Sequence, residues 1–399
     1  MRKKETIGTH TAPDLDVDAS LWLLQEYGDP RMKEAVLFFL KGGDETFFNQ
    51  MGITLLDRGR GELDHHGRRF NSIETTASLT AKKLGIAEDK HVLKLLRKVQ
   101  RSDLQGESLP FDISDIIKCA QRNKDLTDEE RIVLGLRTLG AVMEFAKREL
   151  QRDNQWSKMI IEEFLKEKGK RPEKFKDYIK TLGNPRFERP FDLVEILLGE
   201  KAKSGEEVAT KFAGELLELE YKDTSELFER GLADFEKAWK KWVKGQLIVA
   251  DESDEPKFNA ASRYKGATVI VQRNSDGHVQ WFFNTERVDD TLVDSIASMV
   301  RLEECLIQGR EIPPVDLRRS ERIEEIPEWY YYKAPQIGKK KPGRFIQNGS
   351  LTAPDVPVTK IPLDTLRYIA ECAVRYWLNF NWMRWQAERI AYYANKKAA

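Results

Sequence analysis

The sequence is poor in cysteine and histidine and carries no net charge. Its 399 residues include 3 Cys and 5 His, while Lys+Arg and Asp+Glu both number 66. The cysteines, Cys119, Cys305 and Cys372, match neither a zinc-site nor a redox spacing, so we expect reduced, buried thiols. Zero net charge excludes a protein-wide basic field for nucleic acid, so an anionic ligand must be held by a local patch or by metal.

Long apolar runs are also missing. No stretch approaches the roughly 20 apolar residues that a membrane span requires. The N-terminal Met1-Arg-Lys-Lys-Glu leads directly into a strand-like Thr6-Ile-Gly-Thr, without the apolar core of a secretory signal. We therefore expect a cytoplasmic protein that does not bind membranes.

The length predicts more than one domain, because a single core rarely grows beyond about 250–300 residues. Residues 1–111 alternate strand-like runs with helices, which is typical of a parallel α/β sheet. Residues 112–245 predict a helical insert or cap, with a capping box at Thr127-Asp-Glu-Glu130. Residues 246–310 predict a smaller α/β domain, and residues 311–399 a linker and a long aromatic-rich helix. No internal repeat is evident.

Acidic and histidine side chains gather in four short segments near the start of the chain. Three of the 5 histidines lie in them, so the joint pattern is much harder to obtain by chance than a lone Asp-x-Asp turn or a lone His-His pair. Most of these side chains follow strands or begin helices, where open parallel sheets bind ligands. The segments are His10-Thr-Ala-Pro-Asp14-Leu-Asp16-Val-Asp18-Ala-Ser20, Leu55-Leu-Asp57, Asp64-His65-His66 and Arg101-Ser-Asp103.

This set of side chains suits two divalent cations. Hydrolysis of a phosphate ester near neutral pH needs a hydroxide and positive charge on the phosphoryl oxygens, and two metals about 3.5–4 Å apart supply both. Such a pair takes carboxylates and neutral imidazoles, with one carboxylate bridging. Asp18 is instead expected to be a first-turn helix residue stabilised by the helix dipole. The candidate ligands are His10 and Asp14 for one metal, Asp16, His65 and Asp103 for the other, and Asp57 as the bridge.

The joint pattern resembles the DHH phosphoesterase superfamily over residues 5–105. It reads His-x-x-Pro-Asp-x-Asp with Ser four residues later, then Asp, then Asp-His-His, then a distant Asp. The family includes RecJ-like exonucleases, nano-RNases, cyclic-dinucleotide phosphodiesterases and manganese pyrophosphatases. The resemblance implies two Mn²⁺ per chain, with Mg²⁺ as the alternative metal. It implies that one ion is held by His10, Asp14 and Asp57, and that the other is held by Asp16, Asp57, His65 and Asp103. It also implies that His66 faces the scissile phosphate, which makes Asp57 and His66 the expected catalytic residues.

Two features depart from the family's pattern. Only six residues, 58–63, separate Asp57 from Asp64, where the family usually inserts more, and a Gly-rich hairpin would have to return the chain to the site. Asp103 has no strong motif of its own, and Asp112 is the alternative fourth ligand.

Substrate-binding candidates lie beside the metal motif and in the second α/β region. Arg68 and Arg69 could hold phosphate oxygens, or could be ordinary solvated residues. The loop with Ser275, Gly277 and His278 is similar to the family's Gly-rich loop ending in Gly-His, which could aim N–H groups and an imidazole at a phosphate. The same Asp-Gly dipeptide is equally a hairpin signal. Together with Asp64-His-His-Gly-Arg-Arg-Phe-Asn71, this loop is partly similar to Myg-type proteins, whose first motif differs.

Two functions are therefore compared. The first is a metal-dependent phosphoesterase that hydrolyses phosphodiester or phosphomonoester bonds of nucleotides or short single-stranded oligonucleotides, including as an exonuclease. The second is a non-catalytic nucleotide- or RNA-binding regulatory module that retains the DHH fold. The complete ligand set favours the enzyme. The aromatic C-terminal helix predicts internal packing or a homodimer contact; its aromatic residues are Tyr368, Tyr376, Trp377, Trp382 and Trp385.

Overall fold

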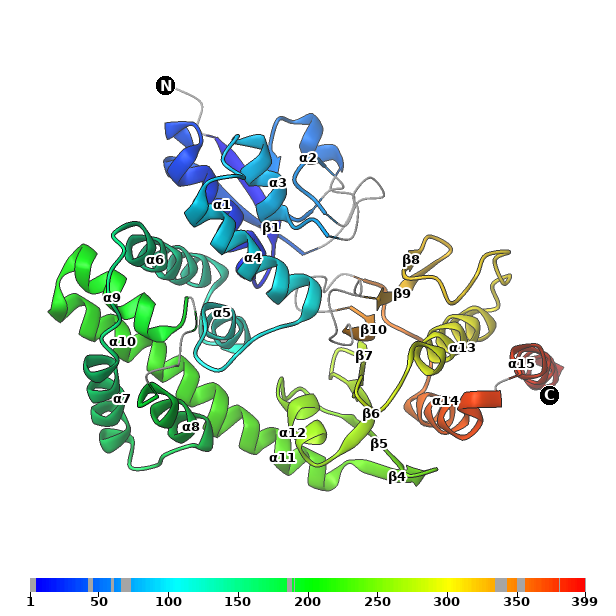
Figure 1. Ribbon diagram of the computed structural model, residues 1–399. Helices are drawn as coiled ribbons and strands as arrows, with labels where there is room; N and C mark the ends of the chain where they lie inside the picture. Colours follow the sequence, from blue (N-terminus) through cyan, green and yellow to red (C-terminus); the bar gives the residue numbers. More distant parts are fainter. Residues whose placement is uncertain are drawn as a thin grey trace. The chain divides into compact units, whose positions relative to one another are not determined.

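The computed structural model divides the chain into two compact units, Met1–Glu226 and Leu227–Ala399 (Figure 1). Each unit combines helices with a sheet, which agrees with the predicted α/β class. Within the part of the chain that the structure describes, no helix is both long and apolar enough to cross a bilayer. The described residues are 5–41, 46–58, 61–65, 73–184, 189, 191–333, 343–349, 356–379 and 381–398.

A parallel three-stranded sheet, in the order β2-β1-β3, lies at the centre of the N-terminal part of the first unit. Gly8 is required in the middle strand, because a Cβ there would lie 2.5 Å from the Phe38 ring and 2.7 Å from Leu55. All strands run in one direction, so their carboxyl ends share one edge, where His10 ends the middle strand. The strands are β1 (Thr6–His10), β2 (Val36–Leu40) and β3 (Thr54–Leu55).

Helix α1 lies between this sheet and the helical part of the unit. It is buried on all sides over residues 15–24, which include the polar residues Asp16, Asp18 and Ser20. Val17 and Leu21 pack into the cluster that includes Ile7 of β1, while Trp22 and Leu23 pack with the helices after residue 112. The first helices are α1 (Leu15–Tyr27), the 3-10 helix η1 (Pro30–Glu34), α2 (Thr46–Gln50), α3 (Thr76–Lys83) and α4 (Lys90–Gln105).

The region predicted as a helical insert is helical, and it shares one hydrophobic core with α1 and α4. The predicted capping box is present, because the Thr127 side chain accepts from Glu130 N and the Glu130 side chain accepts from Thr127 N. The helices are α5 (Ile113–Arg122), α6 (Asp128–Lys147), α7 (Asn154–Lys168), α8 (Glu173–Leu182), α9 (Leu193–Ser204) and α10 (Glu206–Tyr221), followed by the π-helix η2 (Lys222–Leu227) and α11 (Phe228–Lys237).

A short internal repeat, which the sequence analysis missed, joins the two halves of this helical region. Asp112 and Asp192 cap α5 and α9, and each follows a buried phenylalanine with a φ of 63°. The two segments pair in an antiparallel bridge, in which Ile113 N donates to Phe191 O and Leu193 N donates to Phe111 O, both at 2.9 Å. Only a few positions repeat, and they are 80 residues apart, so the sequence pattern is weak.

The second unit corrects the predicted boundaries at 245 and 310. Trp239–Val243 is a strand and not the end of the helical insert, because Lys244 and Gly245 both have positive φ and form a tight turn into β5. The linker expected to begin at residue 311 instead contributes strands to the same sheet, whose order is β4-β5-β6-β7-β10-β9-β8. The strands are β4 (Trp239–Val243), β5 (Gln246–Glu252), β6 (Ala267–Arg273), β7 (Val279–Phe283), β8 (Glu321–Ile323), β9 (Ile326–Lys333) and β10 (Arg344–Asn348).

Both faces of this sheet are covered around β5 and β6. Alternate residues of a strand point to opposite faces. Accordingly, Ile248 and Val269 pack into the cluster with α13 and α14, while Val249 and Ile270 pack into a second cluster with Phe258 of α12. The β5–β6 pair is parallel and the other pairs are antiparallel. The helices are α12 (Phe258–Tyr264), α13 (Asp290–Gln308), α14 (Leu363–Tyr376), the 3-10 helix η3 (Trp377–Asn379) and α15 (Trp382–Ala398).

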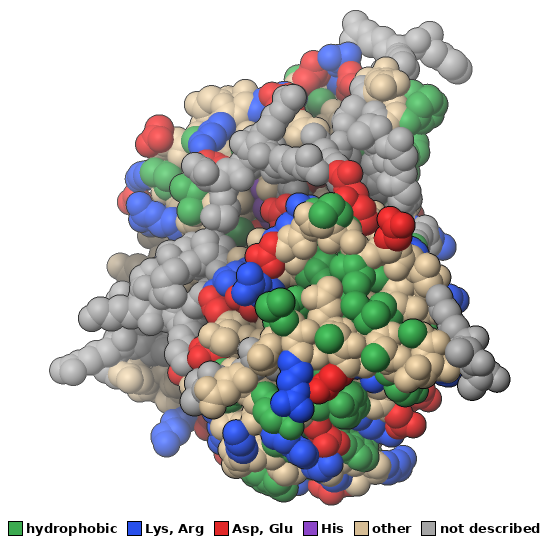
Figure 2. Space-filling model, turned by 90° about the vertical axis from the view of Figure 1, so that its right-hand side faces the viewer, with side chains coloured by type: hydrophobic (Ala, Val, Ile, Leu, Met, Phe, Trp, Pro, Cys, Tyr) green, Lys and Arg blue, Asp and Glu red, His purple; other side chains and the backbone are tan. Residues whose placement is uncertain are grey.

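The predicted long C-terminal helix is two helices, because the chain breaks near Asn381, whose side chain accepts from Arg384 N. The Glu303 carboxylate of α13 binds Arg389 and the Tyr393 hydroxyl, which fixes α15 to α13. Figure 2 looks onto the side that carries α15 in Figure 1, and green apolar side chains gather in the lower half of this view. Met383 is 80 % exposed, so α15 is only partly used for internal packing, and the predicted homodimer contact stays a prediction.

Gly199 of α9 should be intolerant of any side chain. A Cβ there would lie 1.8 Å from Ala141 O of α6, so Gly199→Ala must separate two helices and should destabilise the fold by about 1–3 kcal/mol. Gly214 of α10 is the matched control, because a Cβ there meets nothing within 4 Å, and Gly214→Ala should stabilise by about 0.5–1 kcal/mol. Urea denaturation of both variants checks this; equal effects would contradict the close approach of the helices.

Candidate metal centre

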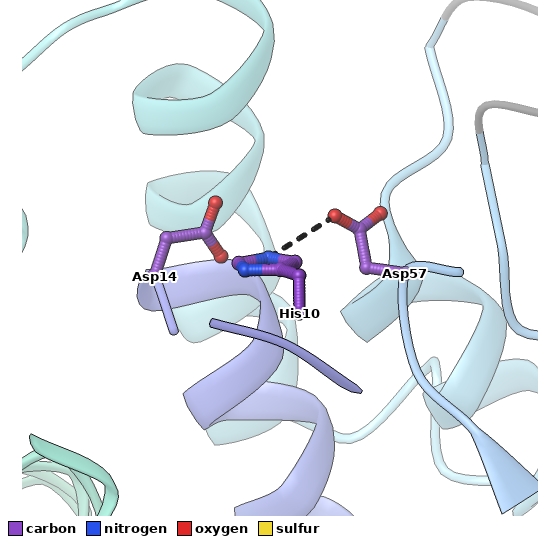
Figure 3. Close-up of side chains that lie close together, drawn as sticks. All are labelled: His10, Asp14 and Asp57. Atoms are coloured by element: carbon purple, nitrogen blue, oxygen red, sulfur yellow. Dashed lines mark ion pairs between the residues drawn. The ribbon is translucent and has the colours of Figure 1, made fainter. Parts of the chain in front are cut away.

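His10 lies at the carboxyl end of β1 with a defined orientation of its ring. Its Nδ1 is 2.8 Å from Thr11 O, and since a carbonyl only accepts, Nδ1 carries the proton of the neutral ring. Its Nε2 faces Asp57 Oδ2 at 3.5 Å (Figure 3). Figure 3 shows the imidazole between the carboxylates of Asp14 and Asp57. The geometry leaves Nε2 as the nitrogen that would bind a metal.

Asp14 has two possible uses at this position. Its Oδ1 caps α1 by accepting from Asp16 N at 3.0 Å and Val17 N at 3.1 Å. The Asp14 carboxylate faces the same space as His10 and Asp57, and donor atoms of the three residues lie within 4.8 Å of one another. A helix cap and a metal ligand are therefore compatible here, because each carboxylate oxygen has two lone pairs.

Asp57 follows β3 and has a left-handed backbone, with a φ of 57°. Its N–H donates to Leu63 O at 3.0 Å, so the chain returns to the site within a few residues, as the short spacing to Asp64 requires. This return places His65 Nδ1 3.0 Å from Asp57 Oδ1.

His65 connects the remaining carboxylates. Its Nδ1 is 3.5 Å from Asp16 Oδ2, and its Nε2 is 3.3 Å from Asp103 Oδ2. Asp103 lies near the end of α4, and Asp16 lies in the first turn of α1. The donor atoms of Asp16, Asp57 and His65 lie within 4.8 Å of one another. All six predicted ligands are thus brought together, and Asp57 is common to both groups.

Other predicted residues are placed elsewhere or not described. His66, Arg68 and Arg69 lie outside the described residues. Asp112, the alternative fourth ligand, is not at the centre; its carboxylate caps α5 and contacts Lys98. Asp18 is in the first turn of α1, as predicted, and its carboxylate occupies the space that a side chain at Gly135 would need.

Helix α3 contributes to the site in a way that was not predicted from the sequence. The N–H groups of Thr76 and Ala77, in its first turn, donate to the two oxygens of Asp16 at 2.8 and 2.7 Å. The Thr76 hydroxyl donates to Asp57 Oδ1 at 3.0 Å. A helix N-terminus is favourable for a carboxylate, so α3 orients Asp16 by its N–H groups and Asp57, the predicted bridge, by the Thr76 hydroxyl. The Thr75-Thr76 pair at the start of this helix was its sequence signal.

Burial and mutual repulsion shift the pKa values of the centre strongly. Burial lowers the pKa of His10, but the hydrogen bond and charge of Asp57 and the charge of Asp14 outweigh it and raise the pKa to about 9. For His65, burial is likewise outweighed, by Asp57, Asp103 and Asp16, and the pKa rises to about 11. Burial, followed by the charge of Asp103, raises the pKa of Asp16 to about 8. Without metal, protons therefore balance the clustered carboxylates.

A second group, Asp115, Cys119 and Glu220, also has donor atoms within 4.8 Å of one another. Here the cation is already supplied by the protein, because the Lys174 ammonium lies 2.7 Å from Asp115 Oδ2 and also contacts Glu220. This group is therefore a buried ion cluster of the helical region, and the metal centre near β1 is the stronger candidate.

The predicted substrate loop of the second unit is the turn of the β6–β7 hairpin. Its N–H groups are already engaged: Ser275 N donates to Asp254 Oδ1, Gly277 N to Asn274 O and His278 N to Asn274 Oδ1, at 2.8, 2.9 and 2.8 Å. The hairpin alternative therefore describes the backbone. These bonds weaken the predicted phosphate role of the loop's N–H groups, and a role for the His278 imidazole stays a prediction.

Comparisons with known proteins leave the family open. No protein-family model and no curated protein match the chain. Among solved structures, an uncharacterized protein from Helicobacter pylori G27 matches with a TM-score of 0.27 and 13 % identity, over 70 % of this chain and 86 % of that chain. A likeness at this TM-score carries no argument, so membership of the DHH superfamily stays a prediction that depends on the residues of the site.

Metal binding should release protons from the centre. Near neutral pH, His10, His65 and Asp16, with pKa values of about 9, 11 and 8, hold protons that a divalent cation must displace. Affinity for Mn²⁺ should therefore rise as the pH rises from neutral toward about 9. Calorimetric titration in buffers of different ionisation enthalpy measures the protons released; an apparent enthalpy that is independent of the buffer would contradict the assignment.

Proposed function

We propose that this protein is a two-metal phosphoesterase of the DHH type that hydrolyses nucleotides or short single-stranded oligonucleotides. The observation that carries the proposal is the position of Asp57, whose carboxylate belongs to both donor groups. A shared carboxylate is what a pair of cations about 3.5–4 Å apart requires, and such pairs are typical of phosphatases and nucleases.

The donor set fits hard divalent cations. Four carboxylates and two imidazoles face one another, and His10, Asp16 and Asp57 are only 3 %, 1 % and 7 % exposed. Buried charges of one sign are costly unless they are neutralised. Carboxylates suit Mn²⁺ and Mg²⁺, and the imidazoles shift the preference toward Mn²⁺. No thiol lies in either donor group, so the set does not favour a soft metal.

In this proposal the residues of the chain hold and orient the reacting groups. When bound, the two cations supply an acidified water and positive charge against the phosphoryl oxygens. His10 and Asp14 hold one cation, Asp16, His65 and Asp103 the other, and Asp57 both. Thr76 fixes Asp57 by its hydroxyl bond, and the first turn of α3 fixes Asp16. Such outer contacts keep ligands in one geometry, which is a large part of metal affinity.

Substrate size is inferred from charge. The chain has 66 acidic and 66 basic residues, and nonspecific affinity for a polymer comes from neutralising its phosphates. Long duplexes should therefore bind weakly, and the metal centre itself must supply most of the attraction for phosphate. We propose short single-stranded oligonucleotides or nucleotides as substrates, with His66, Arg68, Arg69 and His278 as candidate phosphate contacts. The regulatory-module alternative is less favoured, because a module without catalysis has no need for a complete donor set.

Asp57→Ala should abolish hydrolysis and remove most of the bound manganese, because both donor groups lose a ligand. Asp18→Asn is the matched control from the same unit. Its carboxylate packs against Gly135 and belongs to neither donor group, so activity and about two manganese per chain should persist. Elemental analysis and a steady-state assay check both. Near-normal activity of Asp57→Ala would rule out the two-metal assignment.

A product-resolved screen with Mn²⁺ should find faster turnover of short substrates than of long duplexes. The panel comprises mononucleotides, linear and cyclic dinucleotides, short single-stranded RNA and DNA, and long duplex DNA, with Asp57→Ala as the blank. We expect cleavage of at least one short substrate and little cleavage of the duplex, because zero net charge gives no long-range capture. Tight nucleotide binding without any product would favour the regulatory module instead.

A further inference from the structure

Ala12 is a strained residue between two candidate ligands. It lies after His10 and before Asp14, and its φ is 52°, in the left-handed region that residues with a Cβ seldom adopt. It is 5 % exposed, and Pro13 follows it, which further restricts its backbone. A strained conformation persists only where the surroundings hold it, and it then defines the direction of the chain on both sides.

The surroundings that hold Ala12 come from the helical region. Ala12 N donates to Asp128 Oδ1 at 2.9 Å, and Ala12 O accepts from Gln121 Nε2 at 3.0 Å. Both backbone polar groups of this one residue are therefore bound by side chains more than 100 positions later in the sequence. Asp128 is the first residue of α6, and Gln121 lies in the last turn of α5.

The Asp128 side chain is itself held in place by a third residue. Arg131 binds Asp128 Oδ1 and also donates to Ala120 O at 3.2 Å and Asn123 O at 2.9 Å, which joins the start of α6 to the end of α5. The junction of α5 and α6 thus holds the backbone of Ala12 in place through two hydrogen bonds.

We propose that Asp128 and Gln121 are positioning residues that set the geometry of the His10–Asp14 half of the metal centre. The inference rests on the proposed function. Without the two bonds Ala12 relaxes toward negative φ, and this rotation moves Asp14 relative to His10. The other half is held differently: Asp16 by the first turn of α3, and Asp103 by α4. The two bonds to Ala12 therefore control the affinity of one cation and not of the other.

Calorimetric titration of metal-free full-length protein with MnCl₂ tests this, because it resolves the two affinities separately. In Asp128→Ala, one affinity should fall by about 10-fold to 100-fold, the usual effect of losing an outer contact, while the other stays within about twofold. Gln121→Ala should weaken the same step. Asp128→Asn keeps the oxygen that accepts from Ala12 N and should bind both cations like the wild type.

A rescue variant separates positioning from general damage. Ala12→Gly in the Asp128→Ala background should recover part of the lost affinity, because glycine adopts positive φ without the cost of a Cβ. Thermal unfolding of each metal-free variant is measured in parallel. A purely structural role would lower both affinities together with the melting temperature, and the glycine would restore nothing.

The outcomes are distinct. Unchanged affinities in Asp128→Ala, an equal loss of both, or a loss in Asp128→Asn as large as in Asp128→Ala would each overturn the positioning role. If the wild type binds two manganese ions but hydrolyses no phosphate ester, the proposed function fails while the metal titrations still decide the inference. If the wild type binds no manganese, both fail.

Discussion

The mutual repulsion of buried carboxylates is the constraint on which the first unit depends. The carboxylates of Asp14, Asp16, Asp57 and Asp103 come from three segments of the chain and lie around two imidazoles, and those of Asp16 and Asp57 are buried. Folding brings these charges together only because protons or cations compensate them. The rest of the unit supports such a site in three ways. The parallel strands end at one edge of the sheet, and the N-terminus of α3 binds Asp16. The start of α6 holds the loop between His10 and Asp14.

The same constraint explains the role of the helical region. In sequence it resembles an insert, but in the fold it shares a core with α1, which lies between it and the sheet. α1 carries Asp16, and its N-cap is Asp14, so the packing of this helix determines where these two carboxylates lie. A change in the helical core can therefore shift the candidate ligands without replacing any of them.

Four of the six candidate ligands were predictable because each follows a local rule. His10 ends a strand, Asp14 and Asp16 begin a helix, and Asp57 follows a strand, and parallel topology brings such positions to one edge. The residues that orient the ligands were not predictable, because Thr76, Gln121 and Asp128 act through pairs 19, 109 and 116 positions apart. The boundary errors have a similar cause. β8 and β9 join the sheet only through β10, whose other partner is the distant strand β7, so no local pattern in this segment shows that it belongs to the sheet.

Electron paramagnetic resonance of the manganese-loaded protein tests the shared role of Asp57 most directly. Two Mn²⁺ ions that share the Asp57 carboxylate are close enough for their electron spins to couple. The spectrum at two equivalents should therefore show a coupled pair, and the coupling should vanish in Asp57→Ala while Asp18→Asn retains it. Spectra of isolated, uncoupled ions in the wild type, or a single bound ion per chain, would contradict the account.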